Sequence, residues 1–430
     1  MTVSQVHRAK IRETTQGFLA RLFNRTQGKS GKKISHKDLF TDSLIGGGMR
    51  SYMVTPGQPV WMDRNYVQFA LEAYIKNVIA HRAMGMVSGA AASVKLKLYS
   101  VGPKGTRKEI KAHPVLDILK QPNPTHAMGE FFKALYEYRL ISGNAFVQAV
   151  GPTNGPPAEL HLLRPDRMAV IAGKATMPAG YRYTVNGVAT DFPMDRISGR
   201  SSVLHIKNFH PLNDWYGLSP VEAAAYSIDQ HNQSGAWNQA LLQNGARPSG
   251  ALVVRADASG GGVLSEDQYN RVKLQIDDQF TGAANAGRPL LLEGGLDWKE
   301  MSLTPKDMDF VEAKNSSARD IALAFGVPPQ MLGIPGDNTY SNLQEARLAL
   351  WEQTVVPLVR VTADTLNSWL VPMFGGQMEL CPDTDNISAL ALRNQAIWDR
   401  VEKASFLTDD EKRAAVGYGP LAKGGVAATS

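Results

Sequence analysis

The sequence predicts an α+β fold in which long helices carry a small separate β-α-β-β unit. Three observations indicate this fold. Amphipathic helices and short strands alternate in the first half, two long helix patterns flank the small unit, and a third long helix with an internal proline follows. With 430 residues, of which 43% are hydrophobic and 20% charged, the chain can build substantial cores, so disorder is excluded as its dominant state.

A basic segment opens the chain. Residues 1–37 contain nine Lys and Arg against one acid, Glu13, so this segment carries +8 while the whole chain carries +6. We expect residues 1–60 to form a basic flexible arm, with a short amphipathic helix within 17–25. The arm is either a solvated tail or a contact for a polyanion or a partner.

The region that follows predicts an α+β unit. Apolar residues recur every three or four positions over 66–92, which favours a helix, and alternate with polar ones over 94–101, which favours a strand. Short helices are expected over 113–124 and 126–144. Further strands, separated by Gly, Pro and Asn turns, are expected within 145–152, 158–165, 167–173, 181–187 and 202–209.

The longest helix pattern covers 219–245. Ser219 suits the N-cap, Pro220 the first helical position and Gly245 the C-terminal stop. The middle of this helix is strongly polar, so we expect it to be exposed to solvent or to pack on other helices with a mixed face.

The small unit and the remaining helices come next. We expect a strand at 250–254, a helix at 264–280 and a hairpin at 289–303 that turns at Gly294-Gly295. A second long helix over 309–326 stops before Pro328, because residues preceding proline resist helical geometry. After a Gly/Pro/Asn-rich loop at 331–340, a third helix runs from 341 to about 370, kinked at Pro357, and the end of the chain is helical over about 386–418.

Motifs of catalysis and cofactor binding are absent. The sequence contains no phosphate-binding loop, dinucleotide fingerprint, His-Glu-x-x-His or Gly-x-Ser-x-Gly. The single cysteine, Cys381, excludes an internal disulfide and a cysteine-built zinc site. No apolar run reaches about 18 residues, so no membrane span is expected. We therefore predict a soluble protein of a reducing compartment that is not an enzyme and has no catalytic, cofactor-binding or metal-binding residues.

A helical hairpin with a small domain at its tip needs neighbours to bury its apolar stripe, and repeated head-to-tail packing of identical hairpins closes a ring.

Five stretches also resemble one family in the same order. The sequence is similar to the tailed-bacteriophage portal proteins of the HK97-like family. The matching stretches are HPVLDILKQPNP, EYRLISGNAFVQ, LHLLRPDRMAV, GLSPVEAA and AFGVPPQMLGIPGDNTYSNLQEARLALWEQTVVPLV.

This resemblance implies a ring, typically of twelve copies, at one vertex of the capsid. Double-stranded DNA would enter and leave through its axial channel during packaging and ejection. The implied partners are the major capsid protein, the large terminase and then the head–tail connector, or adaptor, protein. The implied location is the portal vertex of the virion, after assembly in the host cytoplasm.

The resemblance also assigns parts of a portal-type architecture. It implies an α/β wing (61–218 and, with the kinked helix, 341–385), stem helices (219–248 and 306–332), a clip (249–305), a tunnel loop (333–340) and a short helical crown with the C-terminal tail (386–430). The tunnel loop would face DNA through Gly333, Ile334, Pro335, Gly336, Asp337, Asn338, Thr339 and Tyr340.

Charge agrees with a channel that DNA slides through. Residues 219–340 contain 15 acids and 9 bases, a net −6, which would repel phosphates if much of it faces the lumen. Lys314 and Arg319 are exceptions on the second stem helix. They would contact DNA weakly or pair with Glu312, Asp320 or a neighbouring subunit, and we favour pairing.

Two other functions stay open at this point. One is a mobile-element nuclease or hydrolase that uses scattered carboxylates such as Asp277-Asp278 and Asp409-Asp410. The other is a nucleic-acid-binding module that acts through the basic arm. Particle size separates them from a ring, which would be near half a megadalton.

Overall fold

The computed structural model describes residues 62–102, 107–152, 155–173, 177–195, 197–243, 250–254, 265–280, 296–300, 310–335 and 340–416. The basic arm predicted over 1–60, with its helix at 17–25, lies outside them. So do the predicted stop at Gly245, the turn at Gly294-Gly295 and the tail after residue 416.

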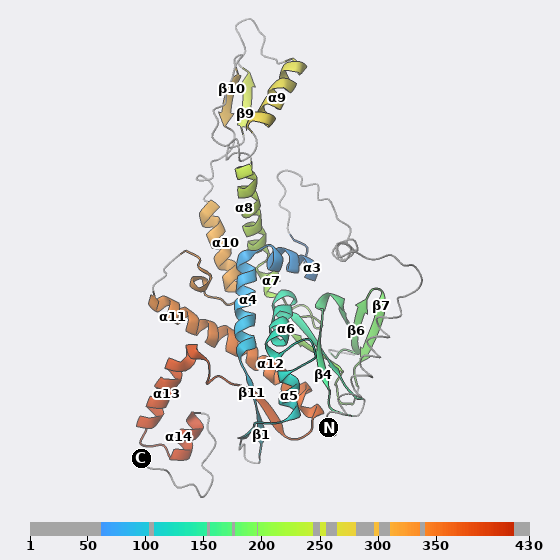
Figure 1. The fold of residues 1–430 in the computed structure, drawn as a ribbon, viewed down its shortest axis with the longest axis vertical. Coiled ribbons are helices and arrows are strands. Elements are labelled where there is room, and N and C mark those ends of the chain that lie inside the picture. The colour runs from blue at the N-terminus through green and yellow to red at the C-terminus, as the bar shows by residue number, and fades with distance from the viewer. Residues whose placement is uncertain are drawn as a thin grey trace. The chain divides into compact units, whose positions relative to one another are not determined.

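Two helices, α4 (Val78–Ser93) and α6 (Met128–Ser142), form the centre of the main hydrophobic core (Figure 1). Helix α4 presents small residues such as Ala80 and Ala83, which are fully buried and let α6 approach closely. Helix α6 contributes the large side chains Phe131 and Leu135, and it ends at Gly143 with a left-handed φ of 74°.

The single helix predicted over 66–92 was wrong in one respect, because it is divided. Helix α3 (Tyr66–Gln68) continues into the π-helix η1 (Phe69–Ile75), and α4 starts afresh after Asn77. The side-chain oxygen of Asn77 accepts from the backbone N–H groups of Ile79 (3.1 Å) and Ala80 (3.0 Å). Asparagine satisfies these free donors better as an N-cap than inside a helix, so it starts a second helix.

Three antiparallel sheets accompany these helices. Their strand orders are β11-β1-β2, β4-β3-β8 and β5-β6-β7. The strands are β1 (Leu96–Val101), β2 (Arg107–Ile110), β3 (Asn144–Val150), β4 (Glu159–Leu163), β5 (Met168–Ile171), β6 (Gly180–Val185), β7 (Val188–Pro193), β8 (Val203–Lys207) and β11 (Met378–Pro382). The expected strands are confirmed, whereas β2, β7 and β11 were not predicted. Short helices α5 (Pro114–Lys120) and η3 (Pro165–Arg167) connect them.

A second, smaller core joins the last two of these sheets. It consists of Phe146, Leu163, Met168, Tyr181 and Val203, which come from β3, β4, β5, β6 and β8. The two sheets are therefore held together by apolar packing.

The predicted long helix over 219–245 is interrupted once. Ser219 caps α7 (Pro220–Ala223) as expected, its Oγ accepting from the N–H of Val221 at 3.0 Å. The chain then turns at Ala224 and continues as α8 (Ala225–Gln243). The β-bearing unit that follows has β9 (Gly250–Val254), α9 (Glu266–Phe280) and β10 (Leu296–Glu300), with β9 and β10 paired antiparallel.

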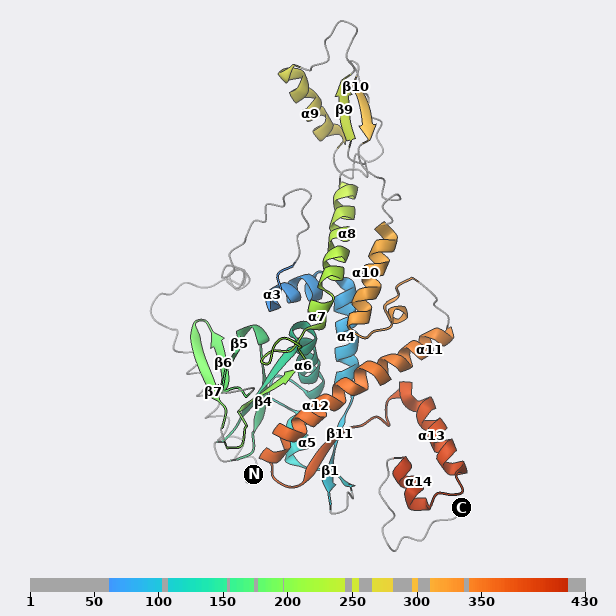
Figure 2. The ribbon, with the colours of Figure 1, turned by 180° about the vertical axis from the view of Figure 1, so that it is seen from behind.

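Helix α10 (Phe310–Ala324) returns from this unit and lies beside α8 in both views (Figures 1 and 2). A 3₁₀ turn, η5 (Pro329–Leu332), leads to α11 (Tyr340–Ala349), the π-helix η6 (Leu350–Val355) and α12 (Val356–Trp369). The irregularity predicted at Pro357 thus takes the form of a π-helical segment just before the proline. A 3₁₀ turn, η7 (Val371–Met373), follows α12. The helical end predicted over about 386–418 contains η8 (Ser388–Leu390), α13 (Ala391–Lys403) and α14 (Asp409–Ala415).

Candidate functional site

The α8–α10 hairpin is held by apolar and polar contacts. Ile228 of α8 and Ile321 of α10 are fully buried. Alongside them, Ser227 Oγ donates to Asp320 Oδ2 at 3.3 Å, and Ser317 Oγ donates to Gln230 Oε1 at 3.2 Å. Later residues of α8 meet earlier residues of α10, so the two helices are antiparallel. The polar middle of α8 therefore packs on another helix with a mixed face, as predicted.

A buried polar network fastens α8 to the start of the described chain. The carboxylate of Asp229 accepts from the N–H of Met62 at 3.0 Å, and burial raises the pKa of this carboxyl. Asn77 Nδ2 lies 3.2 Å from His231 Nδ1 and donates to Asn232 Oδ1 at 2.9 Å. Burial lowers the pKa of His231, and the charge of Lys314 lowers it further. These contacts tie α8 to the cap of α4.

The connection from α10 to α11 contains the predicted tunnel loop. Gly333 has a φ of 72°, which suits glycine, and the next residue, Ile334, is 4% exposed. Ile334 packs on Ala318 and Ala322 of α10. The described part of the loop is therefore anchored on the helix that precedes it. Tyr340 begins α11, and the other predicted loop residues, Gly336, Asp337, Asn338 and Thr339, lie outside the described residues.

Arg319 makes a contact that the sequence did not reveal. Its guanidinium donates a hydrogen bond to the backbone carbonyl of Pro335, so α10 holds the loop by charge-assisted hydrogen bonding as well as by apolar packing. Among the described residues, neither Lys314 nor Arg319 forms an ion pair with Glu312 or Asp320. Pairing with a neighbouring subunit and contact with DNA stay predictions.

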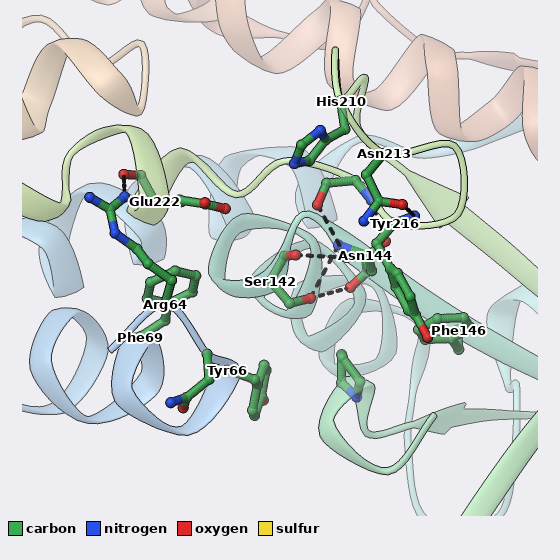
Figure 3. Close-up of a pocket in the computed structure, with 13 residues that line it drawn as sticks. Arg64, Tyr66, Phe69, Ser142, Asn144, Phe146, His210, Asn213, Tyr216 and Glu222 are labelled. Atoms are coloured by element: carbon green, nitrogen blue, oxygen red, sulfur yellow. Dashed lines mark hydrogen bonds between the residues drawn. The ribbon is translucent and has the colours of Figure 1, made fainter. Parts of the chain in front are cut away.

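A polar cavity of about 400 Å³ lies between the start of α3, the end of α6 and the loop before α7 (Figure 3). Ser142 lines it, but its Oγ contacts the backbone carbonyl oxygens of Tyr138 (2.8 Å) and Asn144 (2.7 Å). His210 also lines it, and its Nδ1 accepts from the N–H of Leu212 at 3.0 Å. These hydrogen bonds do not assemble a nucleophile with a base.

Asn144 organises the wall of this cavity. Its Oδ1 accepts from the N–H of Gly217 at 2.7 Å, and its Nδ2 donates to the carbonyls of Ser142 (2.7 Å) and Gly217 (3.3 Å). Figure 3 shows Asn144 beside Ser142 and beneath the Asn213 loop. Asn144 thus fixes the chain that leads into α7 and has a structural role. The helix expected over 126–144 ends with the pair Gly143-Asn144, which is a local signal for a turn at this position.

No group of three or more His, Cys, Asp or Glu able to hold a metal ion occurs within the described ranges. Among those residues, too, no helix is long and apolar enough to span a bilayer.

Solved structures with a similar fold include particle necks and a phage portal protein. The chain is similar to the neck of an empty GTA particle, computed with C6 symmetry (TM-score 0.65, 45% identity, 85% of this chain and 96% of that chain). The neck of the native GTA particle, computed with C12 symmetry, gives 0.63 and 44% over the same shares. An HK97-family phage portal protein from Corynebacterium diphtheriae shares the fold alone (TM-score 0.52, 16% identity, 78% and 99%). The fold and the helical hairpin therefore define a portal-type protein.

Comparisons of sequence indicate the same class of protein. Residues 79–417 match the family described as phage portal protein. An uncharacterized protein of Rickettsia bellii (strain RML369-C) is 45% identical over 359 residues, 83% of this chain and 91% of the relative. The portal protein of Enterobacteria phage HK97 is 24% identical over 296 residues, 68% and 66% of the two chains. The chain belongs to the phage portal protein family, and its function is that of a portal protein at a capsid vertex.

These findings confirm the α+β portal-type fold and the resemblance predicted from the sequence. The family is a structural one. The roles of the individual tunnel-loop residues, of Lys314 and Arg319, and of the separate domains stay predictions.

Proposed function

We propose that twelve copies of this chain form a ring at one vertex of the virion, through which double-stranded DNA is packaged and later ejected. The observation that carries this proposal is the similarity to the GTA neck computed with C12 symmetry, which extends over 96% of that chain at 44% identity. Similarity of this extent supports the same kind of assembly for this chain.

Exposed apolar side chains on the hairpin support assembly. Val311 and Leu323 of α10 are 76% and 77% exposed in the single chain. Large apolar side chains left in water on a long helix favour burial against a neighbour. We assign α8 and α10 to the stem of the ring, where α10 of one copy would meet the next copy.

The surface of the stem suits passage of DNA without tight binding. The exposed residues of α8 include Gln230, Gln233 and Gln239, which are uncharged. The stem–clip segment as a whole has the net −6 described above. A lumen without a basic stripe would let phosphates slide past, since strong nucleic-acid binding depends on Lys and Arg.

The tunnel loop, 333–340, would form the constriction of the channel. Its start is fixed on α10 by Ile334 and by the bond from Arg319 to the Pro335 carbonyl. Lys314 lies nearer the N-terminal end of α10 than Arg319 does, and it would face either a neighbouring subunit or DNA.

The partners follow from the assigned parts. The β9–α9–β10 unit would be the clip that binds the large terminase during packaging and the head–tail connector afterwards. The sheets and α4, α6 and α12 would form the wing, which meets the major capsid protein. Assembly would take place in the host cytoplasm before the ring enters the virion.

Replacement of the clip tests these assignments. A chain in which residues 249–305 are exchanged for a short Gly-Ser linker should still form rings, because the described cores lie outside that segment. It should lose binding to the large terminase in a pull-down and fail to protect DNA from nuclease in a packaging reaction. Retention of terminase binding by this variant would contradict the assignment of the clip.

A further inference from the structure

The π-helix η6 (Leu350–Val355) joins two helices that are held in different ways. Helix α12 is fixed to β11 and to the residues before β8. Asn367 exchanges two hydrogen bonds with the backbone of Leu380 (2.6 and 2.9 Å), and Trp369 Nε1 donates to the carbonyl of Ser201 at 2.8 Å. Helix α11 carries the far end of the predicted tunnel loop. Figure 2 shows α11 and α12 as successive parts of one long helical run. A change within η6 would therefore move α11 against a fixed α12.

The local sequence explains why this segment is π-helical. Pro357 has no N–H, so the carbonyl of Gln353 lacks its α-helical donor, and the proline ring crowds that same carbonyl. The N–H of Val356 bonds to the carbonyl of Trp351, five residues back, which is the π-helical pattern. One extra residue is thus accommodated in the turn before the proline.

A single side chain ties η6 to the α8–α10 hairpin. Thr354 Oγ1 donates to the carbonyl oxygen of Gly326, at the end of α10, over 2.7 Å. The two segments touch closely, because a Cβ added to Gly326 would lie 2.6 Å from Thr354 Oγ1. Gly326 also has a φ of 64°, which glycine adopts readily. This hydrogen bond and close contact therefore fix the position of the π-helical turn relative to the end of α10.

We propose that η6 is a register joint, in which exchange between the π-helical and α-helical forms turns α11 relative to α12, and that Thr354 is the positioning residue that holds the π form. Each residue of an α-helix turns the chain by about 100°, so a shift by one residue rotates everything on α11 by that amount. Displacement of α10 acts on this joint through Gly326. Because α11 carries the far end of the predicted tunnel loop, its rotation would also turn that loop in the DNA channel. This consequence rests on the proposed function, whereas the rotation itself does not.

Distances between spin labels measure the rotation directly. One label goes on α11 at Glu345→Cys and the other on α12 at Arg360→Cys, both exposed positions, in a Cys381→Ser background that removes the single native cysteine. The labelled chain is diluted into unlabelled chain, so that only pairs within one subunit are seen. Along a helix the two positions are about 22 Å apart.

Thr354→Val removes the hydroxyl while keeping the shape of the side chain. We expect a second distance population, shifted by several ångströms, because α11 then samples the α-helical register. Thr365→Val is the matched control: its hydroxyl also donates over 2.7 Å, but to Val361 of its own helix. The control should keep the single parent distance.

Gly326→Ala breaks the same contact from the other side, since its Cβ must displace Thr354. It should give the same second population, and it serves as the test if Thr354→Val does not fold. Thr354→Ser, which retains the hydroxyl, should restore the parent distance. A parent-like distance in whichever of the two contact-breaking variants folds would overturn the proposal, as would an equal change in Thr365→Val.

Discussion

The imidazole Nε2 of His205 lies 2.9 Å from Oδ1 of Asn144, and the two side chains connect β8 with the start of β3. The Asn144 oxygen also accepts from Gly217, so His205 must donate, which requires a proton on Nε2. The imidazole ring stacks on the ring of Phe146, with 4.2 Å between the two ring centroids. Burial lowers the pKa of His205 to about 3. The neutral imidazole is thus part of the packing between the sheets.

This relationship predicts a pH dependence. Because the folded-state pKa lies below the ordinary value, His205 contributes stability that is complete above about pH 6.5 and is lost as the pH falls toward 3. His205→Gln should cost about 1–2 kcal/mol at pH 7, where the stacking and hydrogen bond are lost. At pH 4.5 this cost should shrink or reverse in urea unfolding. A cost that does not change between the two pH values would contradict this account.

Gly143, next to Asn144, predicts a steric effect. A Cβ at this position would lie 2.4 Å from the carbonyl oxygen of Gly217, and the φ of 74° disfavours any L side chain. Gly143→Ala should therefore lower stability by more than about 2 kcal/mol. Gly187→Ala is the matched control, since its φ is 78° but nothing lies within 4 Å of the added Cβ. We expect about 1 kcal/mol there, and equal losses in thermal unfolding would disprove the role of the close approach.

The bond from Arg319 to the Pro335 carbonyl predicts faster amide exchange when it is removed. In Arg319→Gln, the amides of Met331, Gly333 and Ile334 should exchange roughly three- to tenfold faster by hydrogen–deuterium exchange, because the end of the turn is released. Arg347→Gln on α11 serves as a control for loss of an exposed cation. Unchanged exchange in Arg319→Gln would show that apolar packing of Ile334 alone holds the loop.

Exposed leucine on α10 predicts a loss of assembly. Leu323→Asp should leave the helical content of the chain unchanged, because this side chain is 77% exposed in one copy. It should reduce ring formation at least tenfold by mass photometry, since a buried charge at a subunit contact is costly. Val188→Asp on β7, 66% exposed, should leave rings intact. Rings that form equally well with both variants would place the subunit contact elsewhere.

Local signals in the sequence predicted much of the fold. Ser219 and Pro220 marked the start of a helix, and Gly143 marked the end of another, because capping depends on neighbouring residues only. The divided helix at Asn77 also had a local signal, an N-cap residue inside an apolar pattern, which the periodicity outweighed.

Long-range contacts explain what the sequence did not reveal. Strand β11 pairs with β1, which precedes it by more than 270 residues, so no local pattern indicates the partner. The same holds for the candidate site: Thr354 meets Gly326, and Arg319 meets Pro335, through helix packing and backbone carbonyls. Every residue has a backbone carbonyl, so the residue type does not indicate which carbonyl accepts a hydrogen bond. Such contacts can be identified only from a structure.

The mass and symmetry of the purified full-length chain test the central claim most directly. Twelve copies of 46.8 kDa correspond to a particle of about 560 kDa, which class averages from electron microscopy should show as a twelvefold ring with an axial channel. A particle of 46.8 kDa at the concentrations used for imaging, with no annular classes, would contradict the ring and the channel built on it.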